Sequence, residues 1–227
     1  MTIFKYSKEK QLARKAGVLL IGIFLSSLGV SFSVKSTLGA TPVGVCPVVF
    51  SQPLGISTGT AMWILLGLFF VGQIIILKKD FSLFQLLQLA ASLVYGSLVD
   101  LTIYILSYLP HDSLWLKVIY CALGVITLAL GVFTMVRINF ILLPQDAIVY
   151  VISKKYNKEY GRIKIGLDSM LTAIAIVGSW LLYKRLVHLG IGTIISALLV
   201  GKIISKLKEL KGLNDFIGRV IGEGQTV

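Results

Sequence analysis

The amino-acid sequence predicts an all-α polytopic membrane protein with six transmembrane helices, arranged in two inverted repeats of three that each carry a short extra helix. Of the 227 residues, 56% are hydrophobic and only 14% are charged, which places the chain in the membrane class. Long apolar runs alternate with short charged or proline-containing breaks. In addition, the chain matches itself when it is shifted by 102 positions. We therefore expect one membrane domain over 1–227.

The charge of the chain points to a membrane rather than to a nucleic acid. The formal net charge is +12, but the cations gather in the breaks between apolar runs. This placement is typical of positive-inside topology signals, so we expect a lipid bilayer and no nucleic acid as partner. Cys46 and Cys121 lie in apolar sequence without metal-ligand spacing, which predicts core residues and neither a metal nor a cofactor. The apolar run after Lys15 is about 20 residues long, which suits a retained span rather than a cleaved signal.

A basic tail at 1–15 precedes the first repeat, which is expected over about 16–109. The first span ends in a break closed by Pro42, and the apolar stretch 43–51 is too short to cross a bilayer. We interpret this stretch as a short helix with Pro42 at or near its first turn, lying in the interface or re-entering the membrane. The three spans of the repeat are expected at about 16–35, 59–77 and 83–109.

The third span carries a polar stripe at every fourth residue, through Gln88, Ser92, Gly96 and Asp100. Residues four apart share a helix face, so the stripe must face protein or water rather than lipid. Asp100 precedes Leu109, at the expected end of the span, by about 13 Å of helix. A carboxylate at that depth needs a partner, a proton or water. Asp100 is therefore a coupling site or half of a structural hydrogen bond between helices.

The second repeat is expected over about 114–207, and its first span runs into an unusual break. Arg137 ends the apolar run, Pro144 follows, and then comes the lone carboxylate of Asp146. We expect a second short helix at 145–156 with Asp146 in its first turn, where the helix dipole favours an acid or where a substrate or proton binds. The spans are expected at about 114–136, 165–183 and 188–207, and an amphipathic tail follows at 208–227.

The distribution of cations predicts the orientation. With six spans, 17 of the 22 Lys and Arg residues fall on the side of the two termini, and Lys164 is counted there as part of a basic loop. The positive-inside rule therefore predicts that both termini are cytoplasmic. Lys164 is also expected to form an ion pair at the interface with Asp168, one helical turn later.

The internal repeat is the main functional signal. Over 22–59 against 124–161, nine aligned pairs are identical, where chance would give about three. The two short-helix prolines coincide, Lys35 falls on Arg137, and a shift of 105 lays the polar stripe over 193–205. Because each unit has three spans, the second must be inverted relative to the first. Inverted repeats with equivalent broken segments are the sequence pattern of secondary transporters.

Four short motifs add a family resemblance; they lie at 38–42, 56–60, 96–100 and 190–193. In this order and spacing they resemble the YczE/YyaS/YitT family of bacterial integral membrane proteins, over nearly the whole chain. That family often has an aromatic or acidic pair after the proline. Here Val43 and Gly44 follow the first proline, whereas Gln145 and Asp146 follow the second. The resemblance implies a protein of the bacterial cytoplasmic membrane and gives no catalytic residues and no established substrate.

We therefore expect a secondary transporter or permease for a small solute, with an anionic solute as one option. An enzyme is not expected, because the sequence contains neither a His-Glu-x-x-His nor a Gly-x-Ser-x-Gly pattern. Cations and short-helix N-termini would attract an anionic group, and Asp100 would take a coupling proton. The alternative is a non-transporting accessory protein that binds or stabilises a membrane partner, and a homo-oligomer is a further option. The candidate site residues are Lys35, Pro42, Gln88, Asp100, Arg137, Pro144 and Asp146.

Arg137 receives the most specific expectation. A guanidinium group keeps its proton at physiological pH, so a buried Arg137 must contact a carboxylate, a carbonyl, a solute or water. We expect Arg137 and Asp100 to border a shared polar cavity, and Asp146 is close enough in sequence to pair with Arg137. Snorkelling of Arg137 to the lipid headgroups is the alternative.

Overall fold

The structure, a computed structural model, describes the backbone of residues 2–110 and 112–223 and the side chains of 11–110 and 112–223. His111 of the expected turn and residues 224–227 of the expected tail lie outside the described residues. All regular structure in the described part is helical, which confirms the predicted all-α class. The elements are α1 (Thr2–Ser36), α2 (Pro42–Leu54), α3 (Thr58–Leu77), η1 (Lys78–Asp80), η2 (Leu83–Leu86), α4 (Leu87–Ser107), α5 (Leu114–Ile138), α6 (Pro144–Lys155), α7 (Tyr160–Tyr183), α8 (Ile191–Glu209) and α9 (Lys211–Ile221).

Five helical segments are long and apolar enough to cross a bilayer: Gln11–Ser36, Thr58–Asp80, Leu83–Ser107, Leu114–Ile138 and Tyr160–Tyr183. Large apolar side chains on their outward faces are strongly exposed, for example Leu68 at 65% and Leu181 at 64%. Lipid accommodates such faces and water does not, so the chain is an integral membrane protein. The sixth expected span coincides with α8, which is not among these five segments. The second half of α8 carries Lys202, Lys206 and Lys208.

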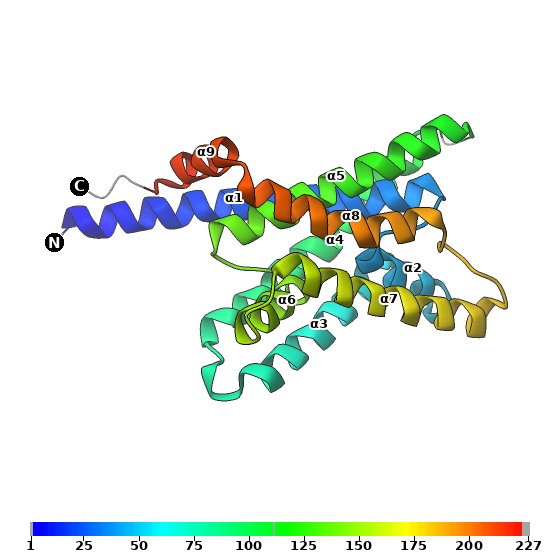
Figure 1. Cartoon of the computed structure of the whole chain (residues 1–227), viewed down its shortest axis with the longest axis horizontal. Coiled ribbons are helices and arrows are strands. Elements are labelled where there is room, and N and C mark those ends of the chain that lie inside the picture. Colours follow the sequence, from blue (N-terminus) through cyan, green and yellow to red (C-terminus); the bar gives the residue numbers. More distant parts are fainter. Residues whose placement is uncertain (1, 111, 224–227) are drawn as a thin grey trace.

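Helices α1 and α5 lie side by side along much of their length (Figure 1), and their apolar segments are the most buried of the five. Small residues let the two backbones approach closely. A Cβ atom on Gly29 would lie 2.6 Å from the Leu128 nitrogen, and one on Gly131 would lie 2.6 Å from the Ser26 nitrogen. The shift of 102 relates Gly29 to Gly131 and Ser26 to Leu128, so the two contacts are reciprocal.

The remaining long helices form two hairpins that also correspond. Helix α3 packs on α4 where Gly59 meets Gly96, and α7 packs on α8 where Gly161 meets Gly201. Helix α4 lies against α1, and α8 lies against α5. The short helices cross between the halves, because α2 contacts α7 and α6 contacts α3. Each short helix also contacts its own half, α2 through α3 and α6 through α7, so it lies between the two hairpins.

Both short helices begin at a proline, as the sequence predicts. Pro42 and Pro144 lie in the first turns of α2 and α6, and the residues before them, Thr41 and Leu143, are extended. Proline fixes a helical φ angle and favours an extended residue before it, so both starts are set locally. Gly55 ends α2 with a φ of 63°, a left-handed conformation that glycine adopts without strain.

The two largest differences from the expected boundaries both place residues in helices. The expected basic tail is part of α1, since residues 2–15 contain no proline or glycine to interrupt a helix. Helix α7 begins at Tyr160 rather than near 165, which moves Lys164 from a loop into a helix. The predicted amphipathic tail segment is α9, which lies beside α1 and α5 (Figure 1).

Candidate functional site

The start of α6 places Asp146 in the protein interior. Pro144 is the first residue of the helix, so Asp146 lies in the first turn, where the helix dipole favours a negative charge. Its backbone N–H donates to the Leu143 carbonyl at 2.9 Å, and its side chain is fully buried. An ionised carboxylate in such a place needs charged or hydrogen-bonding partners.

One face of α7 supplies these partners. Lys164 Nζ lies 3.4 Å from Asp146 Oδ1 and 3.0 Å from Asp168 Oδ1. The Tyr160 hydroxyl donates to Asp146 Oδ1 at 3.2 Å. Tyr160, Lys164 and Asp168 share a helix face because they are spaced by four residues. We refer to Asp146, Tyr160, Lys164 and Asp168, which are all buried, as the charged cluster.

The charged cluster contains two carboxylates and one ammonium group, so its formal charge is negative by one when all groups are ionised. Lys164 is close enough to form an ion pair with each aspartate. However, Lys164 Nζ and Asp168 Oδ1 form no hydrogen bond of regular geometry with the described residues, and neither does Asp146 Oδ2. Excess buried charge is costly unless a proton or a cation neutralises it. The arrangement can therefore bind and release a proton at one of its carboxylates.

Further buried polar atoms near the charged cluster lack partners. Gln145 Oε1 and the hydroxyl of Tyr95, on α4, form no hydrogen bond with the described residues. Tyr95 lies on α4, which contacts α6. Buried polar groups are nearly always hydrogen-bonded, so these atoms mark places for water or a ligand.

A polar cavity adjoins the same short helix. It has a volume of about 250 Å³ and lies between α3, η2, the start of α4, the α5–α6 loop and α6. Ala147 and Tyr150 line it; Ala147 directly follows Asp146, and Tyr150 follows Asp146 by one helical turn, so the cavity and the charged cluster lie against the same stretch of α6. None of its described lining residues is charged. We call it the amide cavity after its polar lining of Gln73, Ser82, Gln85, Gln88 and Asn139.

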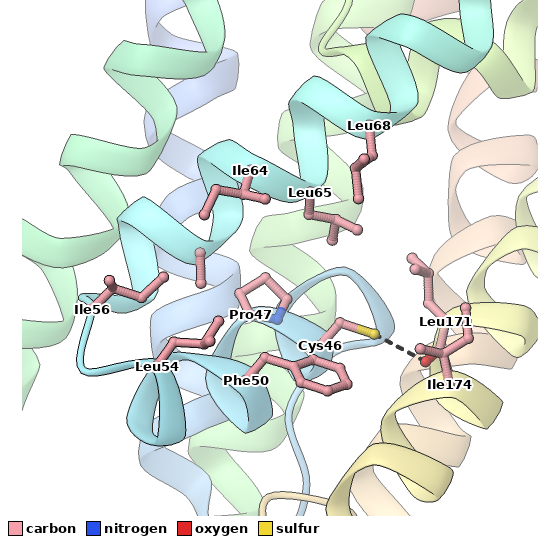
Figure 2. A pocket seen from close by; sticks show the side chains of 11 residues that line it. Cys46, Pro47, Phe50, Leu54, Ile56, Ile64, Leu65, Leu68, Leu171 and Ile174 are labelled. Atoms are coloured by element: carbon pink, nitrogen blue, oxygen red, sulfur yellow. Dashed lines mark hydrogen bonds between the residues drawn. The ribbon is translucent and has the colours of Figure 1, made fainter.

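A second cavity, of about 310 Å³, has a different chemistry. It lies between α2, α3 and α7, and its lining is apolar apart from the Cys46 thiol, which donates to the Leu171 carbonyl at 3.2 Å (Figure 2). Leu54 and Leu68 of its lining are strongly exposed. Specific small-molecule sites combine apolar walls with a few orienting polar groups. Of these two cavities, the amide cavity is therefore the one that can orient a polar solute.

Asp100 caps the start of α3. Its Oδ1 accepts a hydrogen bond from the Gly59 backbone N–H at 2.7 Å, and its Oδ2 accepts one from the Ser57 hydroxyl at 2.7 Å. A hydrogen bond between helices was one of the two interpretations that the sequence allowed. At the equivalent place in the second half, Ser205 donates to Glu159 at 2.7 Å. The acid and the hydroxyl thus exchange positions between the halves.

The structure does not bring Arg137 to Asp100 or to Asp146. Arg137 Nη2 forms an ion pair with Glu223 at 2.8 Å and donates to the Asn214 carbonyl at 3.1 Å. Its contacts therefore lie with α9 and the residues that follow it. Asp100 faces the start of α3 instead, and Asp146 faces Lys164.

The remaining predicted site residues occupy separate places. Lys35, at the end of α1, donates to the Ser107 carbonyl at 3.1 Å. Pro42 and Pro144 begin the short helices, and Pro144 thereby positions Asp146. Gln88 is buried and lines the amide cavity. Of the predicted set, Gln88, Pro144 and Asp146 thus gather around α6.

The sequence analysis did not assign Tyr160, Lys164 and Asp168 to a site, and it did not predict that Lys164 and Asp168 are buried. The available signal was the spacing of four residues from Tyr160 through Lys164 to Asp168. That spacing predicts one helix face, but it fits an ion pair at the interface equally well. The burial of the face depends on α6, which the sequence does not place.

Comparisons with known proteins agree with the family resemblance. Residues 13–209 match a family described as a family of unknown function, DUF6198. The chain is 26% identical over 187 residues to the uncharacterized protein YyaS of Bacillus subtilis (strain 168). The matched region covers 81% of this chain and 87% of that protein. The YyaS match confirms the resemblance drawn from the motifs. No solved structure matches the chain.

Proposed function

The chain belongs to the family of unknown function DUF6198, and we propose that it is a secondary transporter of the bacterial cytoplasmic membrane. It moves a small solute, and its coupling proton is held by the charged cluster. The observation that carries the proposal is the buried excess carboxylate of this cluster, next to a polar cavity. Intramembrane ionisable groups of this kind typically belong to proton or substrate pathways. Lys164 stabilises whichever of Asp146 and Asp168 remains ionised.

Reciprocal contacts support an inverted-repeat architecture, which is part of the proposal. The elements α1–α4 correspond in order to α5–α8, and the glycine contacts of the first half recur in the second. In this architecture α8 is the sixth span, and both termini are cytoplasmic. Assembly into a homo-oligomer stays a prediction.

Reporter fusions test the orientation and the sixth span together. A reporter that follows Asp112 should lie outside the cell, and one that follows Val227 should lie in the cytoplasm, because the basic segments favour the inside. Activity of a periplasmic and of a cytoplasmic reporter at each site measures the side. If both sites report the same side, α8 does not cross the membrane and the repeat is not inverted.

Uptake into liposomes tests transport and its coupling. We expect the purified protein to accumulate a member of a panel of small metabolites when a pH gradient is applied. Asp146→Asn should abolish gradient-driven accumulation, because Asp168 then pairs with Lys164 and no excess carboxylate is left to bind the proton. Asp100→Asn is the matched control and should retain most of it, since an amide oxygen can still accept from the Gly59 N–H.

The outcomes of this experiment separate the alternatives. Loss of coupling in Asp100→Asn but not in Asp146→Asn would assign the proton to the cap of α3. No uptake of any panel member by the wild-type protein, together with a protein that co-purifies from native membranes, would favour the accessory role.

A further inference from the structure

Two buried glutamines of the amide cavity lack hydrogen-bond partners. Gln73 is 1% exposed, and neither its Nε2 nor its Oε1 has a partner among the described residues. Gln88 is 5% exposed, and its Oε1 likewise has none. Both residues line the cavity. An unsatisfied buried amide is costly, so these groups call for water or a ligand that donates and accepts hydrogen bonds.

The lining also limits the chemistry of that ligand. Carboxamides, a serine hydroxyl and aromatic rings surround the cavity, and no described lining residue is charged. Lys35 and Arg137, the cations expected to attract an anion, are bonded elsewhere. A volume of about 250 Å³ is smaller than the usual site for a drug-sized ligand. We propose that the amide cavity is the solute site and that it binds a small, uncharged, polar solute through Gln73 and Gln88; this inference rests on the proposed transport function.

The place that the internal repeat makes equivalent to the amide cavity is closed. There the loop after α1 meets the start of α8: the Ala40 N–H donates to the His188 carbonyl at 2.8 Å, and the Gly192 N–H donates to the Leu38 carbonyl at 3.0 Å. Ala40 is 1% exposed. Burial lowers the pKa of His188, so a neutral imidazole flanks this contact at neutral pH.

At the amide cavity the corresponding segments form no such backbone contact among the described residues. The shift of 102 carries 38–40 onto 140–142, and the shift of 105 carries 190–193 onto 85–88. Residues 140–142 and, from the other segment, Gln85 and Gln88 line the amide cavity, and no backbone hydrogen bond joins the two segments among the described residues. Phe140 and Phe84 meet edge to face, with ring centres 5.7 Å apart. The amide cavity is thus the open member of a pair of equivalent openings, as expected for a solute site in one state of a transport cycle.

Matched cysteines test whether the cavity is open to water. Leu142 lines the cavity, and Ala40 is its equivalent in the closed contact. In the full chain, Leu142→Cys should react with a water-soluble maleimide at least about tenfold faster than Ala40→Cys, because burial suppresses reaction. The wild-type protein, with buried Cys46 and Cys121, gives the background, and detergent denaturation confirms both introduced thiols. Equal rates, or faster reaction at Ala40→Cys, would overturn the assignment of an open cavity.

Protection of the same thiol tests the class of solute. Labelling of Leu142→Cys is repeated with excess glycerol, urea, acetamide, acetate or choline as probes. We expect at least one uncharged probe to slow the reaction and the two ions to leave it unchanged. Protection by an ion alone, or by no probe at all, would overturn the proposal.

Gln73→Met in the Leu142→Cys background separates binding from packing. Methionine removes the unsatisfied amide at similar volume, so thermal stability should stay the same or rise while protection disappears. Retained protection would remove Gln73 from the site. These readouts need neither transport nor a proton, so an uncoupled protein would fail the uptake test and still show protection. Conversely, coupled uptake without protection would support the transport function and would show that the solute binds outside the amide cavity.

Discussion

Replacing Lys164 by methionine should lower the free energy of unfolding by about 3–5 kcal/mol, because two buried carboxylates lose their common cation. Protonation of both acids would reduce this cost without removing it, since each carboxyl group would still need hydrogen-bond partners. For a chain of this size the midpoint of thermal unfolding should fall by roughly 10 °C. Thermal unfolding of the purified protein in detergent, followed by size-exclusion chromatography, measures the change.

Arg162→Met is the matched control on the same helix. Arg162 is 79% exposed and lies 3.8 Å from Glu159, and exposed pairs of this kind contribute at most about 1 kcal/mol. Combining Lys164→Met with Asp146→Asn and Asp168→Asn should recover part of the lost stability, because no excess charge stays buried. Equal midpoints for Lys164→Met and Arg162→Met would show that the charged cluster is hydrated and contributes little to the fold.

The parts of the fold that depend on local chemistry could be predicted from the sequence. Pro42 and Pro144 mark the starts of the short helices because proline itself fixes the backbone of a first helical turn. Gly55 ends α2 for an equally local reason. The long helices follow from the length and composition of the apolar runs. The burial of Lys164 near the start of α7 could not be predicted in this way, since it depends on the contacts of its ammonium group with Asp146 and Asp168.

The candidate site could be predicted in part. Asp146 stands out as a lone acid after a proline, and that pattern located the start of α6 correctly. The choice of its partner relied on sequence distance, which favoured Arg137. The contact with Lys164 depends on how α6 packs against α7, and the ion pair of Arg137 with Glu223 depends on where the C-terminal segment folds. Neither packing arrangement leaves a periodic signal in the chain.

Substituting valine for Gly29 should strongly disrupt the packing of α1 on α5. The Cβ atom alone would lie 2.6 Å from the Leu128 nitrogen and 2.8 Å from its Cα atom, so α5 must move away from α1. A backbone atom cannot yield as a flexible side chain does, and the contact lies in the most extensive helix pair of the fold. We expect a loss of about 3 kcal/mol or more, at the upper end for overpacked cores. Thermal unfolding in detergent measures it.

Two further glycine substitutions test whether the loss of stability arises from the close contact between α1 and α5. Gly17→Val is the control on the same helix, because a Cβ atom there would meet nothing within 4 Å. It should leave stability unchanged within about 1 kcal/mol, since valine has a better helix propensity than glycine. Gly131→Val should match Gly29→Val, because its Cβ atom would lie 2.6 Å from the Ser26 nitrogen and the shift of 102 makes the two contacts equivalent. If Gly131→Val left stability unchanged while Gly29→Val lowered it, the two contacts between α1 and α5 would not be energetically equivalent. The reciprocal contacts would then no longer support a repeat.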